Sequence, residues 1–115
     1  MQIFDPYATV AVPFPFTDRN SSKHRPAVVF SLRSFQKETG TCTCAMITSV
    51  PSAWPGDVPI TDQNAAGLRV PSKIRLKSFT LDLDLIVRPR GTLAAVDKEG
   101  LKQALVTHCA LETQS

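Results

Sequence analysis

The sequence has no apolar run that approaches the roughly 20 residues a transmembrane helix needs. It begins MQIFDPYATVAV, without the basic segment and long apolar stretch of a signal peptide, so we expect a cytoplasmic protein with no membrane association. It has only three cysteines, which cannot all pair within one chain. We therefore expect reduced thiols and not a disulfide framework.

The motifs of several familiar enzyme classes are also missing. The chain has no P-loop, no glycine-rich dinucleotide turn, no HExxH and no paired-carboxylate site. A metal site from Cys42, Cys44 and either His24 or His108 is an open alternative, although it lacks a second cysteine pair and a His-x-His spacing. We favour small buried thiols at these positions and expect neither a metal ion nor a cofactor.

Length and composition favour one small, mainly β domain that spans residues 1–115. Hydrophobic residues make up 43% and charged residues 20% of the chain, values typical of a soluble globular domain. Nine prolines and five glycines divide it into short segments, which strands form more often than long helices do. The formal net charge of +3 permits a polyanionic partner without requiring one.

Hydrophobic patterning predicts five to seven short strands followed by one helix. The expected strands cover 8–12, 27–31, 41–49, 58–60, 70–76, and 85–88 with the segment around 92–93. A turn at 36–40 would make a hairpin of the second and third strands. The helix is expected from Lys98 to about Leu111, with Asp97 as its N-cap and an apolar face that includes His108.

The hairpin brings an arginine and a threonine to the same end. Arg25 opens one strand and Thr48 ends its neighbour, so in an antiparallel hairpin with its turn at 36–40 both lie near the open end. Arginine offers a rigid fork of donors to phosphate oxygens, and a hydroxyl can add another hydrogen bond to the charge that develops in a transition state. Their convergence suits phosphodiester chemistry, although a surface arginine and a strand-ending threonine also have a purely structural interpretation. Lys73, Arg75, Arg88 and Arg90 have no assigned role.

Several segments resemble the MazF/PemK-like toxins in order and spacing. The most specific are Lys23-His24-Arg25-Pro26-Ala27-Val28-Val29 and Cys44-Ala45-Met46-Ile47-Thr48-Ser49, because they coincide with the expected pocket. Val12-Pro13-Phe14-Pro15-Phe16-Thr17-Asp18, Pro55-Gly56-Asp57-Val58-Pro59-Ile60, Ala66-Gly67-Leu68 and Gly91-Thr92-Leu93 extend the resemblance over nearly the whole chain.

This resemblance implies an SH3-like barrel with a C-terminal helix and a homodimer. It also implies metal-independent cleavage of single-stranded RNA at short motifs, which leaves a 2′,3′-cyclic phosphate and a 5′-hydroxyl, and a cognate antitoxin that blocks the site. Arg25 and Thr48 would then be the catalytic residues at the scissile phosphate. The residues that would line the RNA path are Phe16, Thr17, Lys23, His24 and Ser49.

The chain departs from the family pattern at two places, which keeps two alternatives open. Ala8-Thr9 replaces the usual Gly-Asp, and Asn20-Ser21-Ser22 stands where some members carry an acidic residue. A catalytically degenerate barrel that binds protein or nucleic acid is the first alternative. The second is a topoisomerase poison of the CcdB type, but the ending Leu111-Glu112-Thr113-Gln114-Ser115 lacks that group's tryptophan.

Overall fold

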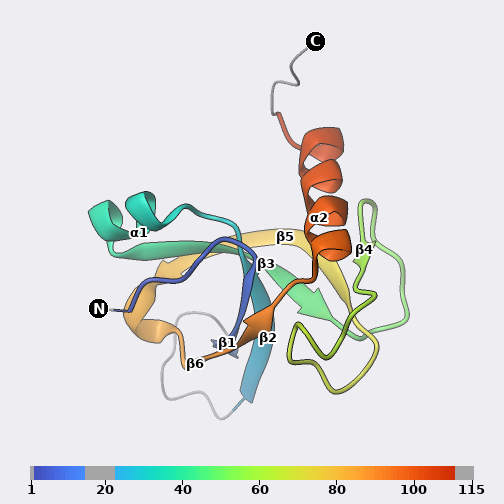
Figure 1. Cartoon of the computed structure of the whole chain (residues 1–115), viewed down its shortest axis with the longest axis horizontal. Coiled ribbons are helices and arrows are strands. Elements are labelled where there is room, and N and C mark those ends of the chain that lie inside the picture. The colour runs from blue at the N-terminus through green and yellow to red at the C-terminus, as the bar shows by residue number, and fades with distance from the viewer. Residues whose placement is uncertain (1, 15–22, 111–115) are drawn as a thin grey trace.

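A computed structural model of the chain describes residues 2–14 and 23–110. These residues form a curled antiparallel sheet, a half-barrel, with helix α2 (Ala95–His108) at its C-terminal end (Figure 1). In spatial order the strands are β4 (Val58–Pro59), β5 (Lys73–Asp82), β3 (Thr41–Thr48), β2 (Lys23–Val29), β1 (Ala8–Phe14) and β6 (Arg88–Thr92). The predicted mainly β fold with a C-terminal helix is confirmed.

The central strands are buried on both faces, as the apolar run in the sequence predicts. Val28 belongs to a cluster under α2 that includes Ile47 and Leu101, whereas Ala27 and Val29 face a second cluster that includes Phe4. Successive side chains of a strand point to opposite faces, so β2 contributes to both clusters. This burial fixes the register of the strands that carry the pocket.

The predicted turn at 36–40 is wrong, because most of that segment is a short helix. Helix α1 (Arg33–Thr39) ends at Gly40, which has a left-handed φ of 69°. Gln36 on this helix is completely buried, and its side-chain amide bonds the backbone N–H and carbonyl of Phe4 and the carbonyl of Ser31. These hydrogen bonds stabilise a helix that no apolar periodicity in the sequence predicts.

Helix α2 begins earlier than predicted, and Asp97 is not its N-cap. The cap position is Ala94, and Asp97 lies in the first turn with only 2% of its surface exposed. Its carboxylate accepts hydrogen bonds from the backbone N–H and hydroxyl of Thr61 and from the N–H of Asp62, at 2.9–3.0 Å. Asp97 therefore joins α2 to the loop after β4. His108, expected on the apolar face, is exposed.

The first four strands keep their predicted places with ends shifted by at most four residues, and the last two strands differ more. The strand expected at 70–76 is β5, which starts at Lys73 and continues to Asp82. Residues 85–87, expected in the last strand, instead include the end of a 3-10 helix (Leu83–Leu85), and β6 starts at Arg88. In the described ranges, no helix combines the length and the apolar character that a membrane span requires.

Candidate active site

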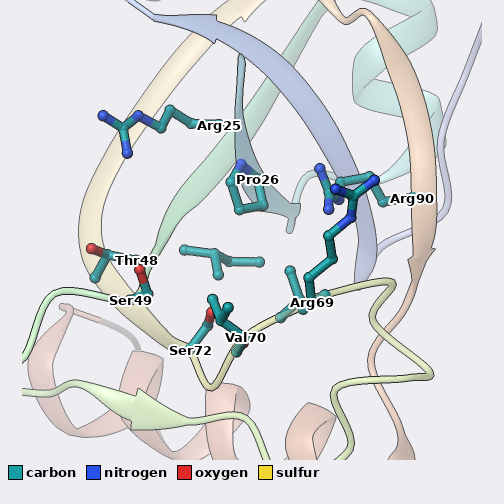
Figure 2. A pocket seen from close by; sticks show the side chains of 10 residues that line it. Arg25, Pro26, Thr48, Ser49, Arg69, Val70, Ser72 and Arg90 are labelled. Carbon is teal, nitrogen blue, oxygen red and sulfur yellow. The ribbon is translucent and has the colours of Figure 1, made fainter. Parts of the chain in front are cut away.

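The strand register places Arg25 and Thr48 at the same end of the β2–β3 pair. The ladder pairs Val29 with Cys44 and Ala27 with Met46 in antiparallel register. Continuing that register by two positions sets Arg25 opposite Thr48. Both side chains line one pocket, which Figure 2 shows with Arg25 and Thr48 on the same side of it.

The pocket has a cationic rim and an apolar floor. Its cavity volume is about 160 Å³, some five times the roughly 30 Å³ that one water molecule takes in the liquid, so a phosphate group fits. Its described lining contains three arginines and neither Asp nor Glu; the lining residues are Arg25, Pro26, Ile47, Thr48, Ser49, Leu68, Arg69, Val70, Ser72 and Arg90. Such a lining attracts an anion and donates hydrogen bonds to it.

The hydroxyl of Thr48, which lines this pocket, has a backbone partner. The backbone N–H of Val50 donates to Thr48 Oγ1 at 3.3 Å. A hydroxyl that already accepts a bond from the backbone keeps its own hydrogen for another acceptor. Thr48 can therefore act as a donor to an oxygen atom bound in the pocket.

The loop after Thr48 is held against β5 by a cluster of charged side chains. Asp57 accepts hydrogen bonds from Arg75 Nε at 3.1 Å and from Arg75 Nη2 at 3.0 Å, and Lys73 Nζ lies 3.4 Å from Asp57 Oδ2. Lys73 and Arg75 both also donate to the carbonyl of Ser52. The hydrogen bonds from Arg75 lower the pKa of Asp57, with a further contribution from Lys73. The cluster stabilises the loop that follows the Thr48–Ser49 side of the pocket.

Two further arginines line the pocket: Arg69, which no pattern in the sequence singles out, and Arg90, for which the sequence predicts no role. Figure 2 shows their guanidinium groups together on the side of the pocket away from Arg25, with the Pro26 ring between the two sides. Arg90 is held in place because its Nε and Nη2 donate to the carbonyl of Gly67 at 3.2 and 3.0 Å. Burial, with the neighbouring cations Arg88 and Arg69, lowers the pKa of Arg90.

Three consecutive carbonyls anchor the segment that carries Arg69. Ala65 accepts from the backbone N–H of Thr92, Ala66 from the hydroxyl of Thr9 at 2.7 Å, and Gly67 from Arg90. The buried Thr9, one of the departures from the family pattern, thus supplies a bond between β1 and this segment. The nearest signal in the sequence is the pairing of a glycine with an arginine in both segments, at 67–69 and 90–91.

A second, more apolar pocket adjoins the first. Thr48, Ser49 and Ser72 line both pockets, and the second is completed by Val50, Pro59, Pro71 and Lys73. Apolar side chains next to a phosphate-sized cationic site can contact a flat base or a sugar.

The remaining predicted residues are only partly placed. Ser49 lines the pocket, whereas Lys23 and His24 are exposed at the start of β2 and do not line it. Phe16 and Thr17 lie outside the described residues. Within the described ranges, no three His, Cys, Asp or Glu side chains are grouped so that they could hold a metal ion. The thiols of Cys42 and Cys44 are buried, as predicted.

The fold and the pocket define a small half-barrel protein with an arginine-lined pocket. The family model described as "PemK-like, MazF-like toxin of type II toxin-antitoxin system" matches residues 7–108. The chain belongs to this family. No curated protein matches it.

Solved structures with the same fold include several toxins. One is an endoribonuclease in complex with its cognate antitoxin from a mycobacterial species; the TM-score is 0.76 at 13% identity, with 99% of this chain and 100% of that chain covered. For MazE-MazF from Deinococcus radiodurans the TM-score is 0.74 at 17% identity, with 97% of this chain and 100% of that chain covered. For the Mycobacterium tuberculosis toxin MazF-mt6 the TM-score is 0.70 at 21% identity, with 94% of this chain and 99% of that chain covered.

Proposed function

We propose that the chain is the endoribonuclease toxin of a type II toxin–antitoxin system and that it cleaves single-stranded RNA at short motifs without a metal ion. The observation that carries the proposal is the convergence of Arg25 and Thr48 on one phosphate-sized pocket, from paired strands in matching register. The family of the chain and the endoribonuclease with the same fold support the same activity.

The proposed reaction uses the 2′-hydroxyl of the RNA itself as the nucleophile. The 2′-oxygen attacks the adjacent phosphorus, a P–O2′ bond forms and the P–O5′ bond breaks. The 2′-hydroxyl gives its proton to water, and the leaving 5′-oxygen takes up a proton from water, so the step is balanced. The products are a 2′,3′-cyclic phosphate and a 5′-hydroxyl. Because the nucleophile is held next to its own phosphate, positioning and charge stabilisation supply most of the catalysis.

Arg25 and Thr48 have distinct roles in this reaction. Arg25 remains protonated and stabilises the negative charge that builds up on the phosphate oxygens. Thr48 donates its hydroxyl hydrogen to the same group, since its oxygen is already occupied by the N–H of Val50. Ser49 and the adjoining apolar pocket would contact the nucleotide beside the scissile bond.

The proposal extends to two protein partners. A cognate antitoxin is expected to cover the pocket, in keeping with the endoribonuclease and MazF structures that were solved as complexes with an antitoxin or MazE. The active protein is proposed to be a homodimer. Lys23 and His24, exposed at the entrance of β2, would lie along the RNA path outside the pocket itself.

The test is incubation of the purified protein with a mixed RNA pool in EDTA, followed by sequencing of the cleavage ends. We expect cleavage at a short motif with 5′-hydroxyl and cyclic phosphate ends. Arg25→Ala should lower the rate by about 10²- to 10³-fold, the usual loss for one transition-state donor. Arg33→Ala, which removes an exposed arginine on α1 whose partner is Asp5, is the matched control and should cleave like the wild type.

Intact RNA in the presence of folded wild-type protein would overturn the proposed activity. Binding of RNA without cleavage, unchanged in Arg25→Ala, would instead favour a barrel that binds nucleic acid. Circular dichroism of each variant separates loss of the pocket from loss of the fold.

A further inference from the structure

The pocket contains a second cationic position that the proposed chemistry does not use. Arg69 and Arg90 lie together on the side opposite Arg25, and the Pro26 ring separates the two sides (Figure 2). One phosphate bound between Arg25 and Thr48 leaves this second position without a ligand. Two guanidinium groups of the same charge repel each other, so their proximity is stabilised most by an anion bound between them.

The two arginines differ in how they are held. Arg90 is fixed by its two hydrogen bonds to the carbonyl of Gly67. The side chain of Arg69 is exposed and has no hydrogen-bond or ion-pair partner among residues 2–14 and 23–110. Its backbone is nonetheless well anchored, because the carbonyls just before it accept bonds from Thr92, Thr9 and Arg90. Arg69 is thus an unengaged cation on a fixed support.

We propose that Arg69 and Arg90 bind a second RNA phosphate, next along the strand to the one held by Arg25 and Thr48. This inference rests on the proposed function and adds a substrate requirement to it. An RNA strand offers phosphates in regular succession on either side of each nucleoside, and a pocket with two cationic sides matches two of them. The pair therefore favours a linkage that has a further phosphate on the side of Arg69 and Arg90 over a linkage at which the strand ends on that side.

The number of phosphates that a protein contacts is measured by the salt dependence of binding. The binding constant K decreases as the salt concentration rises. For single strands, the steepness of log K against log salt is reduced by about 0.7 for each phosphate contact that is lost. The probe is a short single-stranded DNA of random sequence, labelled for fluorescence anisotropy, which lacks the 2′-hydroxyl and therefore stays intact. The variants are Arg69→Gln, Arg25→Gln and the double variant, with Arg33→Gln as the matched control on α1.

We expect Arg69→Gln and Arg25→Gln each to reduce the slope by about 0.7, and the double variant by about 1.4, because the two arginines meet different phosphates. Arg33→Gln should leave the slope unchanged. A double variant that loses no more than Arg25→Gln alone would show one shared phosphate and overturn the proposal. The proposal also fails if Arg69→Gln behaves like Arg33→Gln, or if the wild type does not bind the DNA at low salt.

RNA cleavage measured on the same preparations keeps this inference apart from the proposed function. If the wild type cleaves RNA and Arg69→Gln leaves the slope unchanged, the nuclease activity is supported and the second phosphate contact is excluded. If the slope changes are additive and no RNA is cleaved, the two phosphate contacts are supported and the nuclease activity is excluded. Arg69→Gln is the main variant, since Arg90→Gln would also break the bonds to Gly67 that support the pocket.

Discussion

Asp57 is bonded to Arg75 through two parallel hydrogen bonds, from Nε at 3.1 Å and from Nη2 at 3.0 Å, with 13% and 9% of the two side chains exposed. The pair closes the base of the loop that runs from Ser49 to β4. This geometry is the bidentate arrangement that gives an arginine–carboxylate pair both strength and direction. The loop beside Thr48 thus depends on an ion pair that is shielded from water.

The first prediction is that Asp57→Asn lowers the free energy of unfolding by about 2 kcal/mol at neutral pH, because a charged hydrogen-bond partner of Arg75 is lost. The pKa of Asp57 is lowered in the folded protein, so its contribution is fully present above the unfolded value of about 3.9 and is lost as the pH falls through the folded pKa. The difference between variant and wild type should therefore shrink below about pH 4. Urea unfolding across that pH range measures it.

Asp5→Asn is the control for this prediction. Asp5 also pairs with an arginine, Arg33, at 3.1 Å, but the Asp5 side chain is 76% exposed. Exposed ion pairs contribute little to stability. An equal effect of the two substitutions, or a difference that persists in acid, would contradict the assigned role of Asp57.

The second prediction concerns two glycines with nearly the same backbone conformation. Gly40 and Gly67 have φ values of 69° and 70°. A Cβ atom added at Gly40 would meet nothing within 4 Å. A Cβ atom added at Gly67 would lie 2.3 Å from the carbonyl oxygen of Arg90. Gly40→Ala should cost about 1 kcal/mol from the left-handed conformation alone. Gly67→Ala should cost about 3 kcal/mol, since the backbone must also move.

Thermal and chemical unfolding of the two alanine variants test this comparison. The difference between them isolates the close approach of β6 to the segment that carries Arg69. Similar stabilities for the two variants would mean that this segment is free to move away from β6. Gly67→Ala should also weaken nucleic-acid binding, because it shifts the carbonyl that holds Arg90.

The third prediction distinguishes the contribution of the Thr48 hydroxyl to RNA cleavage from the contribution of the size of its side chain. Thr48→Val keeps the size of the side chain and removes the donor, so it should reduce RNA cleavage by about 10²-fold. Thr48→Ser keeps the donor and should stay within a few-fold of the wild type. Thr43→Val is the control on the same strand, because Thr43 bonds Thr80 and lies outside the pocket. Single-turnover cleavage rates are the measurement, and full activity of a folded Thr48→Val would exclude a role for this hydroxyl.

The fourth prediction is that only one of the three thiols reacts in the native protein. Cys42 and Cys44 are buried, with their sulfur atoms 3.9 Å apart, whereas Cys109 is exposed. The hydrogen bond from Cys44 to Cys42, together with burial, raises the pKa of Cys44 and keeps it a thiol. A disulfide-exchange reagent should label Cys109 quickly and the other two only in denaturant. Cys109→Ser should abolish the fast reaction; a fast second thiol would show that the core opens.

The sequence was most informative where local pattern and register agree. The apolar run at 27–29 predicts a doubly buried strand, and the structure has one. The sequence also predicts Arg25 and Thr48 at one end of a strand pair, and the structure has them there, although the connection is mostly the helix α1 and not a turn. The pairing of the two strands is antiparallel all the same, and the ladder from Val29–Cys44 to Ala27–Met46 continues to Arg25 opposite Thr48.

The other half of the pocket depends on contacts that no local pattern encodes. Arg69 reaches it because Thr9 bonds Ala66, 57 positions away, and because Arg90 bonds Gly67, 23 positions away. Asp97 is a second example. An aspartate just before a helical pattern predicts an N-cap, and only the folded chain brings Thr61 within hydrogen-bond distance of it. Polar residues that bridge distant segments are thus the part of this fold that a single sequence does not reveal.

The pocket is assembled from pieces of chain that lie far apart, since Arg25, Thr48, Arg69 and Arg90 come from four separate segments. Contacts of such high sequence separation form late, because the intervening chain must first be closed into loops. A chain still being made on a ribosome therefore lacks this pocket until β6 has emerged and paired with β1. The protein therefore gains the complete pocket only after the segment that contains β6 has been translated.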